Sequence, residues 1–225
     1  MNCGDIMPVM KKQAFPISER RSFLTRLKVG VAAAIAVGGV ARAQVKPAAK
    51  FEPARHEKDD WLDALPGKHR LLFDTTSIEG FKNSLLFASN FLVVNRNDYG
   101  LQNTDLAVVV VARHIATSFA FNDAMWAKYS VPMADGYVDP RTKQTPTANG
   151  SKTGLDGLAK QGVQFAVCSM ATRRIAGTIA KATGGDADAI FNELTANLVS
   201  NARMVPAGIV AVNRAQERGY SLVTA

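Results

Sequence analysis

The sequence predicts an α/β fold, a single three-layer domain built on a mostly parallel five-stranded sheet. Residues 106–112 form a continuous apolar, β-branched run, which is typical of a strand covered on both faces. Residues 78–97 carry apolar side chains at helical spacing. Short strand-like runs then alternate with helical segments to the end of the chain, and this alternation indicates parallel strands joined by helices.

The remaining elements follow in order along the chain. Polar residues, prolines and glycines fill residues 130–152, which we expect to form a long loop. Pro206 is expected to open the last helix and Gly219 to close it. The expected strands are 70–74, 106–112, 163–167, 202–205 and 220–223, and the expected helices are 78–97, 121–129, 155–160, 171–181, 186–198 and the segment between Pro206 and Gly219.

Residues 1–43 are typical of a twin-arginine signal peptide. Arg20 and Arg21 precede an aromatic residue and a leucine, and a mildly apolar stretch follows at 29–40. That stretch is too short to span a bilayer, and Ala41-Arg42-Ala43 offers a cleavage site before Gln44. We therefore expect export through the twin-arginine translocase and a periplasmic protein with no stable membrane span after cleavage. An uncleaved anchoring helix is the alternative.

Removal of this signal changes the charge of the chain. Residues 1–43 hold 7 of the 27 basic and 2 of the 19 acidic residues, which leaves 20 basic and 17 acidic residues and a net charge of +3 instead of +8. A net charge this small gives no argument for nucleic acid as a partner. Residues 44–67 are expected to form an extended arm with one helical turn near Trp61, and residues 68–225 the domain.

Candidate site residues gather where the predicted strands end. Right-handed crossovers bring all strand-to-helix turns to one edge of a parallel sheet, and ligands bind at that edge. Cys168 becomes the only cysteine once Cys3 leaves with the signal, so it is either an inert core residue or a reactive thiol at a helix start. The other residues that we expect to bind ligand at or near this edge are Arg113, His114, Thr117, Asp123, Ser169, Met170, Arg173, Pro206 and Gly208.

Several segments at this edge resemble the DsrE/DsrF-like sulfur-relay family with the YchN-like fold. Gly162-Val-Gln-Phe-Ala-Val-Cys168 resembles its glycine-strand-cysteine segment, and Val205-Pro-Ala-Gly208 with Arg218-Gly-Tyr220 resembles its C-terminal signature. The resemblance implies a homo-oligomer, a trimer or a hexamer. It also implies that Cys168 carries a persulfide, as in the members that transfer sulfur.

Several functions remain open from the residues. His114 is a candidate acid, base or ligand-orienting group, and Arg113 or Arg173 could pair with an oxyanion. Cys168, His114, Met170 and Met204 together would suit copper or haem iron, which leaves a non-catalytic binding protein for copper, haem or a small anion as one alternative. A structural partner of a redox enzyme is another. The sequence does not identify a cofactor and does not decide whether the protein is an enzyme.

Overall fold

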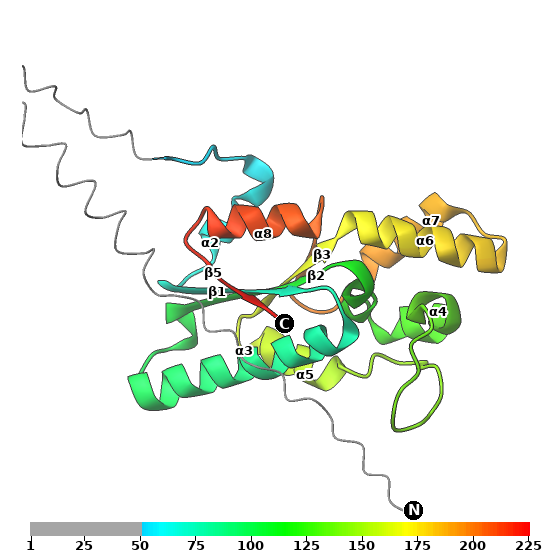
Figure 1. The fold of residues 1–225 in the computed structure, drawn as a ribbon, viewed down its shortest axis with the longest axis horizontal. Helices are drawn as coiled ribbons and strands as arrows, with labels where there is room; N and C mark the ends of the chain where they lie inside the picture. The colour runs from blue at the N-terminus through cyan, green and yellow to red at the C-terminus, as the bar shows by residue number, and fades with distance from the viewer. Residues whose placement is uncertain (1–50) are drawn as a thin grey trace, which may run out of the picture. The chain divides into compact units, whose positions relative to one another are not determined.

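The computed structural model describes residues 51–225, so the predicted export signal and the first residues of the predicted arm lie outside the described part. One five-stranded sheet forms its centre (Figure 1). The strand order is β4-β3-β2-β1-β5, and all neighbouring strands are parallel. The strands are β1 (His69–Thr75), β2 (Leu106–Ala112), β3 (Gln164–Cys168), β4 (Ala202–Val205) and β5 (Ser221–Thr224). The predicted α/β class and the five strands are confirmed, and the sheet is entirely parallel.

Helices connect these strands. A short segment before β1 contains η1 (Glu57–Asp59) and α2 (Trp61–Ala64). The connections after β1 and β2 contain α3 (Ile78–Tyr99), η2 (Asn103–Asp105), η3 (His114–Ala120), α4 (Asp123–Ala134) and α5 (Lys152–Lys160). The later connections contain α6 (Ser169–Thr183), α7 (Ala187–Ala196) and α8 (Gly208–Gln216). Within residues 51–225, no helix has the length and apolar character that crossing a membrane requires.

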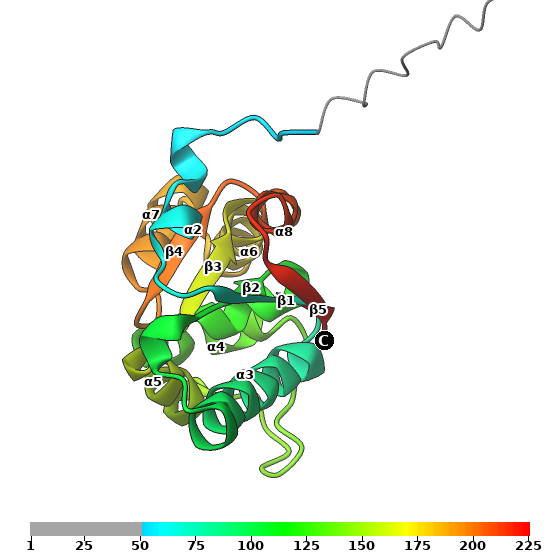
Figure 2. The same cartoon turned by 90° about the vertical axis from the view of Figure 1, so that its left-hand side faces the viewer.

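The two faces of the sheet have separate cores, because side chains of a strand alternate between its faces. Val108, Val110 and Ala112 of β2 belong to the larger core, which α3 to α7 cover. Val109 and Val111 of the same strand face a smaller core beneath α2 and α8. Figure 2 shows α8 and α2 on one side of the strands and α3 and α5 on the other. This division follows from right-handed crossovers, since the chain steps from β1 to β4 in one direction and returns to β5 in the other.

The end of the predicted arm is folded onto its own domain. Leu62 of α2 is 1% exposed and packs in the smaller core. Its carbonyl accepts hydrogen bonds from the Tyr220 hydroxyl at 2.8 Å and from Arg70 at 3.0 Å. Arg218 donates to Asp63 at 2.8 Å. The helical turn expected near Trp61 is α2, and buried aromatic and guanidinium groups near the C-terminus hold residues 57–65 on the domain.

The predicted loop 130–152 is shorter than expected at both ends. α4 continues through Pro132 to Ala134, and α5 already begins at Lys152. Tyr129 interrupts α4 with non-helical φ and ψ angles of −124° and 19°. Pro132 then lies in the first turn after this kink, where a helix does not need its backbone N–H.

Two further boundaries differ from the sequence prediction. Pro206 does not open α8: the helix starts at Gly208, after Ala207 in an extended conformation (φ −148°, ψ 138°). The segment after β2 forms the 3-10 helix η3, in which His114 has the left-handed φ of 57°.

Candidate functional site

At the carboxyl edge of the sheet, the connections that follow two neighbouring strands lead to opposite faces of the sheet. After β3 the chain passes to α6, which packs in the larger core, and after the neighbouring β4 it passes to α8, which packs in the smaller one. Open α/β sheets bind ligands at the carboxyl edge where such connections diverge. Cys168 and Val205 are the paired last residues of β3 and β4. Cys168 therefore ends its strand at the topological switch point of this sheet.

Cys168 is buried, with 7% of its surface exposed. It caps α6, and its Sγ accepts a hydrogen bond from the backbone N–H of Ala171 at 3.5 Å. The hydroxyl of Thr172 donates to the Cys168 carbonyl at 3.0 Å and fixes the backbone at the same point. A backbone N–H and the positive end of a 15-residue helix thus face the thiol.

Arg113 lies beside Cys168 on the same face of the sheet. Ala112 of β2 pairs with Val167 of β3, so Arg113 and Cys168 follow as neighbours in register. Hydrogen bonds to Asp74 raise the pKa of Arg113 above its usual value, burial opposes this, and the negative charge available at Cys168 adds to the increase. The two residues thus lie at the ends of neighbouring strands, and the guanidinium itself is bonded to Asp74 of β1.

Asp74 holds that guanidinium from β1. Its Oδ1 accepts from Arg113 Nε at 2.6 Å and its Oδ2 from a terminal nitrogen at 2.8 Å. The carboxylate is nearly covered, with 8% of the side chain exposed, whereas the arginine side chain is 27% exposed. Such a bidentate pair fixes orientation as well as charge. Asp74 was not among the predicted ligand-binding residues, although its place at the end of β1 indicated this edge.

Gly208 closes the site from above. A Cβ at this position would lie 2.6 Å from the Arg113 Cβ and 3.2 Å from a methyl carbon of Val111. Gly208 thus lets the start of α8 approach β2 closely and confines the Arg113 side chain between helix and strand. Pro206, the other predicted residue of this turn, is exposed.

The remaining predicted residues occupy different surroundings. His114 is exposed, and the described hydrogen bonds and ion pairs do not link it to Cys168. Thr117 is fully buried and donates to the Ala112 carbonyl at 3.3 Å, which stabilises the turn after β2. Met170 is 70% exposed and Ser169 is partly exposed, both in the first turn of α6.

Arg173 and Asp123 point to other partners. Arg173 stacks on Phe191 of α7 at 4.0 Å from the ring centroid and pairs with Asp188 at 3.3 Å. Asp123 accepts the backbone N–H of Asn149 at 2.8 Å and lines a cavity of about 230 Å³ beside α5. The edge therefore brings together Cys168, Arg113 and Gly208 from the predicted set, with Asp74 in addition.

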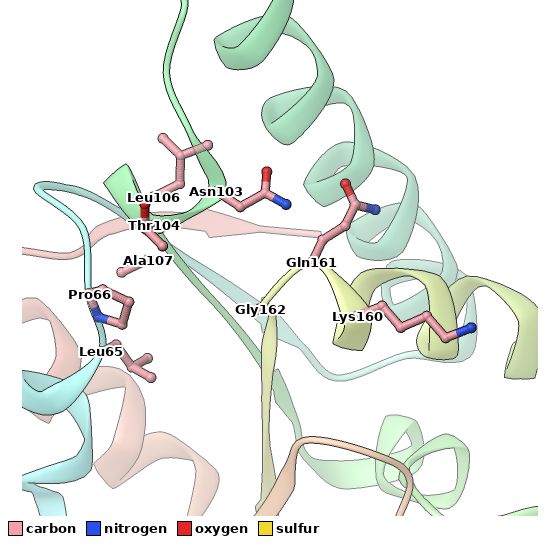
Figure 3. A pocket seen from close by; sticks show the side chains of 9 residues that line it. All are labelled: Leu65, Pro66, Asn103, Thr104, Leu106, Ala107, Lys160, Gln161 and Gly162. Atoms are coloured by element: carbon pink, nitrogen blue, oxygen red, sulfur yellow. The ribbon is translucent and has the colours of Figure 1, made fainter.

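The opposite edge of the sheet also contains a cavity, of about 250 Å³, where β1, β2 and β3 begin (Figure 3). Leu65, Leu106 and Ala107 give it an apolar side, and the carboxamides of Asn103 and Gln161 flank it. Within residues 51–225, no group of three or more His, Cys, Asp or Glu side chains is placed to hold a metal ion.

No protein-family profile and no curated protein matches the chain. A solved structure of a protein of unknown function, MTH1491 from Methanobacterium thermoautotrophicum, is similar to it. The two chains are 19% identical, and the similarity covers 70% of this chain and 100% of MTH1491 with a TM-score of 0.40.

Proposed function

We propose that this protein binds or relays sulfur as a persulfide on Cys168, as a DsrE-like carrier of the periplasm. The observation that carries the proposal is the position of the thiol. Cys168 ends β3 at the switch point of the sheet, receives the Ala171 N–H and lies next to Arg113. Both neighbours favour the thiolate, and the thiolate is the form that attacks sulfur.

The reaction is an exchange between sulfur atoms. The Cys168 thiolate attacks the outer sulfur of a persulfide-bearing donor, the sulfur–sulfur bond of the donor breaks, and the donor leaves as a thiolate. Cys168 then carries the transferred sulfur, and the same exchange with an acceptor thiolate passes it on. No oxidant or reductant is consumed, because the number of sulfur–sulfur bonds is unchanged.

The surrounding residues have supporting roles in this proposal. Arg113 and the start of α6 stabilise the anion before transfer and on the new terminal sulfur after it. His114, exposed after β2, is available to protonate the leaving donor thiolate. Met170 and Ile209, 70% and 57% exposed in the first turns of α6 and α8, give the donor an apolar surface at the same edge.

The export signal, the periplasmic location and assembly into a trimer or hexamer belong to the same proposal. Fractionation of cells that make the full chain should place a protein beginning at Gln44 in the periplasm. Replacement of Arg20 and Arg21 by lysine should retain the uncleaved chain in the cytoplasm. A periplasmic product from the lysine variant would contradict the twin-arginine assignment.

The sulfur proposal is tested by intact mass spectrometry and peptide mapping after incubation with a low-molecular-weight persulfide. The chain has two cysteines, so Cys168→Ser is compared with the matched control Cys3→Ser. We expect one reductant-sensitive sulfur atom on the Cys168 peptide of the wild type and of Cys3→Ser, and none on Cys168→Ser. An unmodified Cys168 thiol in the wild type would overturn the proposal.

A further inference from the structure

The outward side of α3 is apolar and carries no charge. Residues 83–95 contain no Asp, Glu, Lys or Arg, whereas the outer side of a surface helix is ordinarily charged and polar. The large hydrophobic side chains on this side are each between 37% and 56% exposed: Leu86, Phe87, Val93 and Val94. A contiguous apolar stripe of this kind marks a surface that another molecule covers.

Three asparagines repeat along the same side of α3 at intervals of seven residues. Asn83, Asn90 and Asn97 follow the two-turn spacing that keeps side chains on one side of a helix. Asn90 and Asn97 are exposed, and Asn83 is partly exposed. Of the asparagines of α3, all within the described part of the chain, Asn95 alone bonds its own helix, through the Phe91 carbonyl at 2.8 Å. The three carboxamides of the stripe are thus available to a partner.

The order of these residues is the same in both directions from Asn90. The apolar pairs 86–87 and 93–94 lie three and four residues to either side of Asn90. An asparagine follows seven residues away in each direction. If α3 meets a copy of itself in the antiparallel direction with Asn90 opposite Asn90, apolar pairs lie level with apolar pairs and Asn83 lies level with Asn97. Since a carboxamide is both donor and acceptor, such asparagines satisfy each other.

We infer that α3 is a two-fold contact between copies of this chain, in which it packs antiparallel against α3 of a second copy with Asn90 at the axis. An asparagine within an apolar helix contact fixes register and orientation at a cost in affinity. The inference deepens the homo-oligomer of the proposed function by naming a surface for it. A closed trimer has no two-fold axis, so the contact belongs to a dimer or joins two trimers into a hexamer.

The neighbouring helix α5 leaves room for this contact. α3 and α5 lie side by side (Figure 1), and a groove of about 300 Å³ between them is lined, among the described residues, by uncharged side chains and glycines. A Cβ at Gly157 would meet nothing within 4 Å, and a Cβ at Gly154 would meet only a methyl carbon of Leu85, at 3.7 Å. Packing within the chain therefore does not require these glycines, although glycine lowers helix stability. Their low profile leaves α3 open to a second helix.

Cysteine cross-linking tests the pairing and its direction, in the full chain with Cys3→Ser and Cys168→Ser. Helix axes 8–10 Å apart bring facing Cα atoms to about 3–6 Å, a separation that a disulfide can bridge. We expect Asn90→Cys to form a reductant-sensitive covalent dimer under mild oxidation. Asn97→Cys is the matched control, because the antiparallel pair separates its two copies by about 20 Å. Equal cross-linking of both variants, or of Asn97→Cys alone, would overturn the antiparallel pairing.

A like charge at the axis tests whether this contact holds the oligomer together. Asn90→Asp keeps the shape of the side chain and brings two carboxylates together. We expect the dissociation constant of the two-fold contact to rise at least about tenfold, as measured by sedimentation equilibrium. Asn192→Asp adds the same charge at an exposed position of α7 and should leave the dissociation constant unchanged.

The outcomes separate this inference from the proposed function. A hexamer that Asn90→Asp converts to trimers would support both. A dimer that Asn90→Asp converts to monomers would support the two-fold contact and contradict the proposed trimer or hexamer. A trimer that Asn90→Asp leaves unchanged would overturn the inference alone. A monomeric wild type, with no cross-link through Asn90→Cys, would overturn both and would leave the residues before 51 or a different protein as the occupant of this side of α3.

Discussion

Replacement of Tyr220 by Phe tests how the segment 57–65 is held on the domain. The Tyr220 hydroxyl donates to the Leu62 carbonyl at 2.8 Å, and the residue is 4% exposed. The carbonyl keeps a hydrogen bond from Arg70 at 3.0 Å, so the variant leaves no unsatisfied acceptor. We therefore expect the free energy of unfolding to fall by about 1 kcal/mol, the usual value of one hydrogen bond with a satisfied partner.

The same variant should remove a specific dependence on pH. Burial raises the pKa of Tyr220 from 10 to about 12. Below pH 10 the hydroxyl is protonated in both states and its contribution is complete. Between pH 10 and 12 the unfolded chain loses this proton first, so the folded state loses stability as pH rises. Two pKa units correspond to at most about 2.7 kcal/mol, and solvent screening reduces the expected loss to about 1–2 kcal/mol.

Urea unfolding followed by circular dichroism at pH 8 and at several values above pH 10 would measure both effects. The difference in unfolding free energy between wild type and Tyr220→Phe should be about 1 kcal/mol at pH 8 and should shrink above pH 10. Tyr99→Phe is the matched control, because Tyr99 is 72% exposed. A difference that stays constant across pH, or that Tyr99→Phe reproduces, would refute this account of the buried hydroxyl.

Three further substitutions have expected effects on the urea midpoint. Gly208→Ala places a methyl group 2.6 Å from the Arg113 Cβ and should cost about 1–3 kcal/mol by overpacking; an unchanged midpoint would show that α8 can move aside. Asn149→Ala leaves two backbone carbonyls without the amide that donates to both at 2.8 Å, so a loss of about 2–4 kcal/mol is expected, and a loss below 1 kcal/mol would contradict this bridge. Ser77→Ala removes the cap that accepts from Gly80 at 2.9 Å and should cost about 1 kcal/mol, whereas Ser77→Asp should restore most of it.

The sheet was predictable from the sequence because it depends on local composition. The strand predicted at residues 106–112 has the same bounds as β2. Its complete burial agrees with the prediction of a strand covered on both faces. The boundaries that moved depend on distant contacts or on a local compensation. α4 continues through Pro132 because a kink at Tyr129 places the proline in the first turn of a new helical segment, where its missing backbone N–H is not needed. The segment 57–65 follows the buried side chains of Arg218 and Tyr220, more than 150 residues away.

For the site, the sequence could predict only the edge of the sheet at which it lies. Strand ends indicated Cys168, Arg113 and Gly208, because parallel connections bring strand ends together. The pairing of Arg113 with Asp74 requires the register between β1 and β2, and the sequence does not supply that register. Arg173 was expected at the edge from its distance along the chain to Cys168. Its actual partners, Phe191 and Asp188, belong to α7, whose packing against α6 local patterns do not reveal.

The segments that resemble the sulfur-relay family have different tasks in this fold. Arg218-Gly-Tyr220 anchors the segment before β1, with Arg218 bound to Asp63 and Tyr220 to Leu62. Gly208 of the other signature segment gives Arg113 its space. These contacts stabilise the fold, and a protein with the same packing would need them whatever reaction or ligand it had. Cys168 is the part of the resemblance at which chemistry can be tested, because the proposed sulfur transfer requires its thiol.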